Sequence, residues 1–367
     1  MLSCEQGASM KRWFCAALIL LGLAPSALGW SAKEHIQMTR LAVRRLADDA
    51  STPEAMKQWL VKGCMPLYDM EGERRYLMTA RVGQFPRGVD GLPFWSVYPD
   101  LLALAERQDR PAGLFGVPER KLHFIDAEEF APAASLRRYA DDLSGRPPIT
   151  AFPRDPSDAR YQAAGMLPFA VEHHYRQLVR ALKEGRLDDM PGRYPRDDHA
   201  VRWAGTLAHY LADSTQPHHG TRDYKSRSYF PATVAAPDVH SDLEARLVDD
   251  DREDYPELRA QYWKALVAAL EEPPPFQPDD DVWTATLKTV LTSYEALPVI
   301  GRAARAAYPD ATSNGPGRWR AEVFFGYKGR YLGRERSVLE IKAHQQAWGI
   351  RLIETLWRRA WEQAARP

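Results

Sequence analysis

The sequence predicts an all-α protein that forms a single large helical domain. Apolar residues recur at the spacing of amphipathic helices along most of the chain, whereas alternating strand-like runs bounded by turn residues are nearly absent. A chain of 367 residues can bury a sizeable core as one domain. The predicted helices span residues 32–47, 98–108, 157–184, 200–214, 239–250, 256–270, 281–297 and 336–366.

Turn signals mark several of the predicted helix ends. Asp197 or Asp198 can cap the helix that begins near Ala200, and Pro217 prevents this helix from continuing far beyond Ser214. The segment 271–281 contains three successive prolines followed by acidic residues, so it is predicted to be a loop. Both flanks of this loop are equally amphipathic. We therefore expect it to join helices within one domain that spans residues 30–367.

The first 29 residues have the pattern of a secretory signal peptide. Lys11 and Arg12 precede an apolar run over residues 13–23, and a small-residue cleavage site follows at Ala27-Leu28-Gly29. The apolar run is too short for a membrane-spanning helix, and no later segment is more apolar, so no transmembrane segment is predicted. Cleavage would leave Trp30 as the first residue of a secreted or periplasmic protein.

Composition limits the possible function classes. The chain carries 49 Lys and Arg and 49 Asp and Glu, so no overall electrostatic field draws it to nucleic acid or to anionic lipid. Of its three cysteines, only Cys64 follows the predicted cleavage site. A disulfide framework therefore cannot stabilise the exported protein.

The most informative segment is HYLADSTQPHH, residues 209–219, which is followed by DVHSDLE at residues 238–244. His209 and Asp213 are four residues apart and project from one face of a predicted helix, and His240 and Glu244 repeat this spacing on the next helix. His219 lies on the segment between them. Imidazoles and carboxylates are suitable zinc ligands, and two such pairs within 36 residues predict a metal cluster.

These residues, taken with the predicted start of the mature chain, resemble a known superfamily. Trp30 opens the sequence WSAKEH, LHFID occupies residues 122–126, and AWGIRL lies near the C-terminus at residues 347–352. Together with the 209–244 segment, they are similar to bacterial zinc-dependent phospholipase C and to the single-strand-specific nucleases of fungi and plants. The matches are short, but they are distributed over most of the mature chain.

The resemblance implies a cluster of three zinc ions. One ion is expected to be held by His35, Asp213 and the amino and carbonyl groups of Trp30, and the Asp213 carboxylate is expected to bridge to a second ion. The other ligands that the resemblance implies are an upstream aspartate, His123 and His209 for the second ion, and His219, His240 and Glu244 for the third. The interval from Asp213 favours His219 over its neighbour His218 as the ligand of the third ion.

Two aspartates are candidates for the upstream ligand of the second ion. Asp109 lies 14 residues before His123, which is the interval usual in the family. Asp100 lies in VYPDLLALAE, which is more similar to the helix start that carries this ligand in the family, and Asp100 is the preferred candidate. Asp100 and Asp126 are the predicted catalytic carboxylates. Asp126 can orient a metal-bound water or a ligand imidazole.

The resemblance implies hydrolysis of phosphodiesters by metal-bound hydroxide, because zinc lowers the pKa of bound water and neutralises phosphoryl oxygens. The expected substrate is a phospholipid or a single-stranded nucleic acid. The Trp-Ser-Ala opening and Glu244 favour phospholipase C-like activity, while the short interval from Trp30 to His35 favours a nuclease. A non-catalytic protein with structural zinc is the alternative from another class. The sequence does not determine the oligomeric state.

Overall fold

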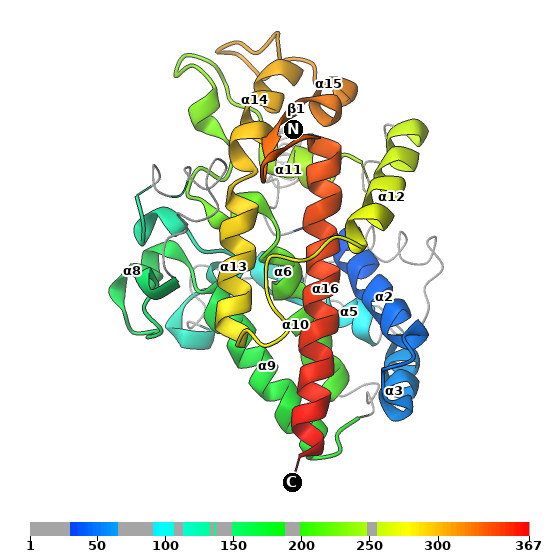
Figure 1. The fold of residues 1–367 in the computed structure, drawn as a ribbon. Helices are drawn as coiled ribbons and strands as arrows, with labels where there is room; N and C mark the ends of the chain where they lie inside the picture. The colour runs from blue at the N-terminus through cyan, green and yellow to red at the C-terminus, as the bar shows by residue number, and fades with distance from the viewer. Residues whose placement is uncertain are drawn as a thin grey trace, which may run out of the picture.

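The prediction of an all-α protein is confirmed by a computed structural model, which describes residues 30–64, 91–105, 113–132, 136, 149–187, 199–247 and 255–366. Within these ranges the chain folds mainly into helices, accompanied by one two-stranded hairpin (Figure 1). The buried apolar side chains of these elements form one hydrophobic core. In the described part of the chain, no helix combines the length and the apolar character needed to cross a membrane.

The helices and strands are as follows, in chain order: α2 (Ala32–Asp48), α3 (Glu54–Cys64), α5 (Leu92–Trp95), α6 (Tyr98–Ala105), α8 (Ala159–Ala164), α9 (Leu167–Lys183), α10 (Ala200–Asp213), α11 (Val239–Glu244), α12 (Pro256–Leu270), α13 (Val282–Tyr294), α14 (Leu297–Ala307), α15 (Ala321–Gly326), β1 (Lys328–Tyr331), β2 (Arg334–Ser337) and α16 (Val338–Ala365).

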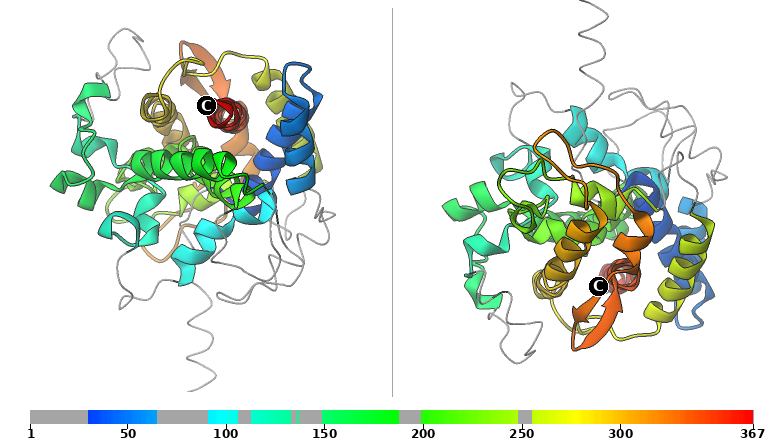
Figure 2. Two further views of the ribbon diagram at one scale, coloured as in Figure 1. Left: turned by 90° about the horizontal axis from the view of Figure 1, so that it is seen from below. Right: turned by 90° about the horizontal axis from the view of Figure 1, so that it is seen from above.

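The long helix α16 is the main support of the fold. It begins with a capping box, in which Ser337 and Glu340 satisfy each other's backbone N–H groups. Helices α2, α9, α10 and α12 all pack against α16 (Figures 1 and 2). Its buried residues extend from Val338 to Ala360, so one helix contacts elements from both ends of the chain. Helices α2 and α10, which carry predicted ligands, are thereby held in fixed relative positions.

Helix α10 is the most deeply buried of the helices that carry predicted ligands. Every residue from Ala204 to Asp213 is buried, because α9, α5, α16 and α2 surround this part of the helix. A Cβ atom at Gly205 would lie only 2.3 Å from Trp95 Cβ, so a glycine is needed for α5 to approach this closely. The predicted end of the helix is close to the observed one, whereas Asp197 and Asp198 lie outside the described residues.

The predicted continuous helix over 157–184 is wrong, because the chain breaks between α8 and α9. Gly165 has φ +95°, and a Cβ atom there would lie 2.2 Å from the carbonyl oxygen of Phe124. At the break, the N–H of Met166 donates to the carbonyl of Lys121 at 2.7 Å. The interruption thus fixes the segment 121–126, which carries His123.

Two other predicted helices are shorter than expected. Helix α11 ends at Glu244, and the helix predicted over 281–297 ends at Tyr294, because Pro298 lies in the first turn of the separate helix α14. Helix α6 is described only as far as Ala105. The sequence patterns also missed the hairpin β1–β2, in which Lys328 pairs with Ser337.

Candidate metal centre

The predicted side-chain ligands are all buried, although they come from six separate elements. The most exposed of them, Asp100, retains only 7% of its accessible surface. Charged and polar side chains are seldom buried this deeply unless they are paired or bind a metal. The ligands and their elements are His35 on α2, Asp100 on α6, His123 directly after the 3₁₀ turn Glu119–Leu122, His209 and Asp213 on α10, His219 in the 3₁₀ turn Pro217–Gly220, and His240 and Glu244 on α11.

The fold brings these side chains together in three groups that can hold metal ions. Within each group, one nitrogen or oxygen atom from each residue lies within 4.8 Å of the others. This separation is close to that of ligands around one zinc ion, given bonds of about 2 Å. The groups are His35 with His209 and Asp213, Asp100 with His123 and His209, and His219 with His240 and Glu244; we call them the first, second and third groups.

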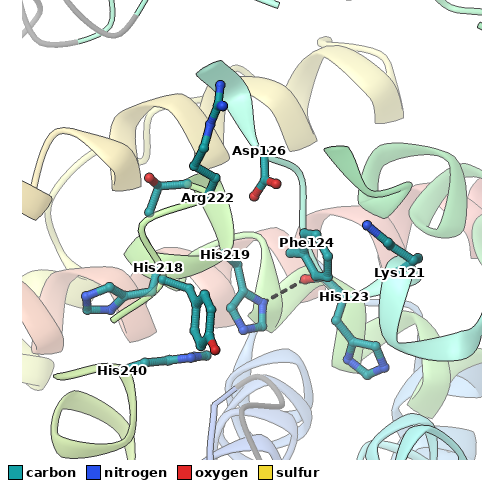
Figure 3. Close-up of a pocket in the computed structure, with 10 residues that line it drawn as sticks. Lys121, His123, Phe124, Asp126, His218, His219, Arg222 and His240 are labelled. Carbon is teal, nitrogen blue, oxygen red and sulfur yellow. Dashed lines mark hydrogen bonds between the residues drawn. The ribbon is translucent and has the colours of Figure 1, made fainter. Parts of the chain in front are cut away.

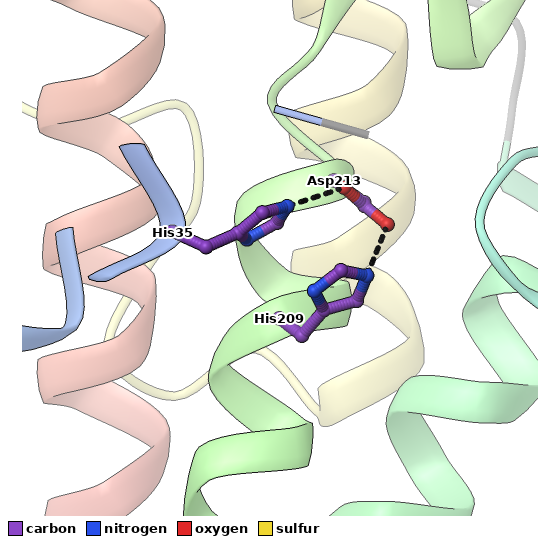
Figure 4. A group of neighbouring side chains, drawn as sticks. All are labelled: His35, His209 and Asp213. Carbon is purple, nitrogen blue, oxygen red and sulfur yellow. Dashed lines mark ion pairs between the residues drawn. The ribbon is translucent and has the colours of Figure 1, made fainter. Parts of the chain in front are cut away.

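Asp213 lies between the first two groups. Its Oδ1 atom is 3.4 Å from His35 Nε2, and its Oδ2 atom is 3.2 Å from His209 Nε2 (Figure 4). The Oδ2 atom also lies 2.9 Å from His123 Nδ1. The two oxygens of this carboxylate therefore face different imidazoles. A carboxylate that bridges two ions needs this arrangement.

Asp100 joins the second group from the first turn of α6. Its Oδ1 atom lies 3.6 Å from His209 Nε2 and 3.7 Å from His123 Nδ1. Burial raises the pKa of Asp100 well above its usual range, and the nearby Asp213 carboxylate raises it further. A bound cation would relieve both effects. The alternative candidate, Asp109, lies outside the described residues.

Backbone carbonyls orient two of the imidazoles. His209 Nδ1 is 2.8 Å from the carbonyl oxygen of Ser96, and His219 Nδ1 is 2.7 Å from the carbonyl oxygen of His123 (Figure 3). Because a carbonyl oxygen only accepts hydrogen bonds, each Nδ1 atom carries the proton. Each Nε2 atom is then available to a metal, as is usual where an imidazole ligand is held by a second hydrogen bond.

The third group is supported by a side chain that sequence patterns did not indicate. Glu244 Oε1 contacts His240 Nε2 and accepts a hydrogen bond from Gln216 Nε2 at 2.6 Å. Gln216 also accepts from the N–H of His218, so it links the His219 turn to α11. His218 itself belongs to none of the three groups, and its Nε2 atom lies 3.0 Å from Ser226 Oγ. The spacing of the histidines and acidic residues carries no signal for Gln216.

Several buried ligand atoms have no hydrogen-bond partner among the described residues. Leaving buried polar atoms unpaired costs about 1–3 kcal/mol each. A cation in each group would coordinate one atom of each of its side chains and so remove part of this cost, and the residues therefore fit metal ions. The atoms that make no hydrogen bond are both ring nitrogens of His35 and of His240, His123 Nε2, Asp100 Oδ1 and Asp213 Oδ1, although His35 Nε2 lies near the Asp213 carboxylate and His240 Nε2 near that of Glu244.

Burial holds His35, His209, His219 and His240 in their neutral form. Burial lowers the pKa of His35 and of His209, because an imidazolium ion loses its hydration there. The same cause lowers the pKa of His219 to about 3 and that of His240 to about 4. Neutral imidazole is the form that binds a metal, so these four side chains are ready to act as ligands at neutral pH.

Trp30 is fully buried beside the end of α10. Its indole Nε1 atom donates to the carbonyl of Ala212 and to Thr215 Oγ1, both at 3.0 Å. Ser31 then caps α2 through a capping box with Glu34, which places His35 on the first turn of this helix. The indole is thus anchored next to Asp213. Coordination through the Trp30 amino group stays a prediction.

A pocket of about 300 Å³ adjoins the second and third groups (Figure 3). His123, His219 and His240 line one side of it. Asp126 also lines the pocket, and burial, with a smaller contribution from Glu128, raises the pKa of Asp126 to about 7. The other lining residues are Lys121, Phe124, His218, Thr221, Arg222 and Tyr224.

Comparison of the sequence with protein-family models and with curated proteins gave no match. The case for a metal centre therefore depends on the geometry and chemistry of the residues themselves.

Proposed function

We propose that this protein is an exported, zinc-dependent phosphodiester hydrolase of the phospholipase C and single-strand nuclease type. The observation that carries the proposal is the adjacency of three buried histidine and carboxylate groups, two of which border a pocket. His123, His219 and His240 contribute both to these groups and to the pocket wall. A purely structural metal site would have no need of such access.

In this proposal, Trp30, His35 and Asp213 hold one zinc ion, and Asp213, Asp100, His123 and His209 hold a second. The third is held by His219, His240 and Glu244. Bound zinc would lower the pKa of a coordinated water towards about 7 and neutralise charge on the phosphoryl oxygens. Asp213 supports the proposal because its two oxygens face imidazoles of different groups.

The pocket side chains suit a phosphodiester. Asp126, whose pKa is raised to about 7, can accept or release a proton near neutral pH, as a general acid or base must. Lys121 and Arg222 bring two positive charges to the pocket wall, where they can stabilise an anionic substrate. Arg222 is oriented by its ion pair with Glu129, at 3.1 Å.

Within this activity we favour a phospholipid substrate, because the zero net charge of the chain provides no extended surface for a long polyanion. A single-stranded nucleic acid is the second candidate. The rings of Phe124 and Tyr224 line the pocket beside Lys121 and Arg222, and aromatic rings next to cations can stack a base and bind its phosphate.

The test uses zinc-loaded protein that begins at Trp30. We expect it to hydrolyse bis-p-nitrophenyl phosphate, to lose this activity with a chelator and to regain it with added zinc. Parallel assays on phosphatidylcholine vesicles and on single-stranded DNA then separate the two substrate classes. Protein that binds zinc but hydrolyses none of the three substrates would establish the structural-zinc alternative.

A further inference from the structure

Lys342 is a fully buried cation next to the metal centre. It lies on α16 with 0% of its surface exposed, which is rare for lysine unless the charge is paired. An ammonium group has three N–H donors. Lys342 Nζ has three oxygen partners, namely the carbonyls of Leu243 and Glu244 and the carboxylate of Glu34. The donors of this buried group are therefore all matched.

Two of these partners are carbonyls in the last turn of α11. Lys342 Nζ lies 2.9 Å from the Glu244 carbonyl oxygen, and it also contacts that of Leu243. The last carbonyls of a helix lack partners within the helix, and a cation there is favourable. Helix α11 has only six residues and is too short to be stable by itself, yet it carries two ligands of the third group. Lys342 thus fixes the end of α11 that presents Glu244.

The third partner connects this contact to the start of α2. Lys342 Nζ is 2.5 Å from Glu34 Oε1, and Glu34 is fully buried and directly precedes His35. Gln346 Nε2, one turn further along α16, donates to the same oxygen at 2.8 Å. Glu34 Oε2 accepts from Ser31 Oγ in the capping box of α2. One ammonium therefore joins the helix that carries Glu244 to the helix that carries His35.

We propose that Lys342 is a positioning residue of the metal centre, which holds the end of α11 against the first turn of α2 and so keeps Glu244 and His240 in place for the third ion. This inference rests on the proposed function. A role in stability alone explains the arrangement less well, because a buried ion pair is often no more stabilising than apolar side chains of similar volume.

The first experiment compares the zinc affinity of two variants by titration against a chromogenic chelator. In Lys342→Met, we expect one of the bound zinc ions to be held about 10–100-fold more weakly, which is the range for residues that orient ligands. The matched control is Lys288→Met, which removes a lysine paired with Asp280 at 2.6 Å on α13 and should leave zinc affinity unchanged. In a His240→Ala background, where the third group is already broken, Lys342→Met should cause no further loss.

A second variant separates positioning from stability. The double variant Glu34→Gln with Lys342→Met removes both buried charges, so its thermal stability should recover towards that of the wild type. Its zinc affinity should remain weakened, because the carbonyls of Leu243 and Glu244 still lack their donor. If Lys342→Met alone does not fold, the double variant can be used in its place to measure zinc affinity.

The outcomes are distinct. Wild-type zinc affinity in the double variant would overturn the inference and leave Lys342 with a structural role only. Wild-type protein that binds zinc without hydrolysing phosphodiesters would overturn the proposed function, while the affinity comparison would still decide the inference. Wild-type protein that binds no zinc would overturn both.

Discussion

The first and third groups of the metal centre differ in their surroundings. His35, His209 and Asp213 come from two long helices, are at most 1% exposed and do not line the pocket. His219 and His240 come from a 3₁₀ turn and a six-residue helix, and both line the pocket. The first group is therefore enclosed by the core, whereas two residues of the third group face the pocket.

This contrast predicts that the first and third groups differ in how their ligands are held in place. Ligands on long packed helices hold their positions because the whole core resists displacement. Ligands on short elements need additional contacts, and the third group receives them from Gln216 and Lys342. We expect changes in the first group to affect metal binding most and changes near the pocket to affect chemistry most. The following predictions test this difference.

The largest effect is expected for Asp213→Asn. Asn keeps the shape of the side chain but loses the charge that faces both the first and the second group, so two zinc ions should be lost or weakened. Hydrolysis should fall by more than about 100-fold, since even residues that only orient ligands contribute 10–100-fold. Metal analysis of purified protein checks this, and an unchanged zinc content would contradict the bridging role.

The next effect concerns Trp30, the predicted first residue after removal of the signal peptide. A free amino group has a pKa of about 8 and can give up its proton to bind a metal, whereas an amide nitrogen within the chain cannot. Protein with a methionine or a tag before Trp30 should therefore lose the ion bound with His35, together with most of its activity. Its helical content, measured by circular dichroism, should stay the same.

The matched control is Trp30→Phe with a correctly cleaved N-terminus. This variant retains the amino group, so it should keep much of the metal. It loses the indole hydrogen bonds to Ala212 and Thr215, which should lower stability by about 1 kcal/mol. Tagged protein that binds three zinc ions and is as active as the mature form would rule out coordination by the amino group.

A smaller and more selective effect is expected at the His218-His219 pair. His219 belongs to the third group, while His218 contacts Ser226 instead. His219→Ala should lower kcat/KM by about 100-fold or more, and His218→Ala by at most about 10-fold. Steady-state assays of both variants on bis-p-nitrophenyl phosphate decide the matter. Equal losses would show that the third group is wrongly composed.

The smallest effect is a pH dependence at Asp126, measured on metal-free protein. Burial raises the pKa of Asp126 in the folded state to about 7 from an ordinary value of 3.8. Between these values the folded protein keeps a proton that the unfolded chain has lost, so stability falls as pH rises from about 4 to 7. Asn cannot ionise. The melting temperature of Asp126→Asn relative to the wild type should therefore increase from pH 4 to pH 8.

Asp158→Asn is a suitable control for this measurement. Hydrogen bonds from the side chain and from the backbone N–H of Arg160 lower the pKa of Asp158 to about 2. This carboxylate is therefore ionised in the folded protein from pH 4 to pH 8. Its replacement should produce no trend between about pH 5 and pH 8, where this carboxylate is ionised in both the folded and the unfolded chain. A constant difference between Asp126→Asn and the wild type over the same range would show that Asp126 has an ordinary pKa in the folded protein.

Sequence patterns were sufficient to predict the two histidine–carboxylate pairs, because these pairs depend only on helix periodicity. Residues four apart on a helix share a face whatever the rest of the fold does, so His209 with Asp213 and His240 with Glu244 could be paired from the sequence. The same periodicity overestimated the helix over 157–184. Apolar periodicity carries no information about Gly165, which adopts a positive φ and lets the Phe124 backbone approach closely.

By itself, the sequence determined the helical class and the two histidine–carboxylate pairs, since these follow from spacing along the chain and from residue chemistry. The other candidate ligands, His35, Asp100 and His123 among them, were implied by the resemblance to a zinc-dependent superfamily. Only the tertiary structure decided that Asp100 meets His123 and His209, and that Lys342 joins Glu34 to the end of α11. These contacts connect segments far apart in the chain. They depend on how α16, α10 and α2 pack together, and no local propensity specifies that packing.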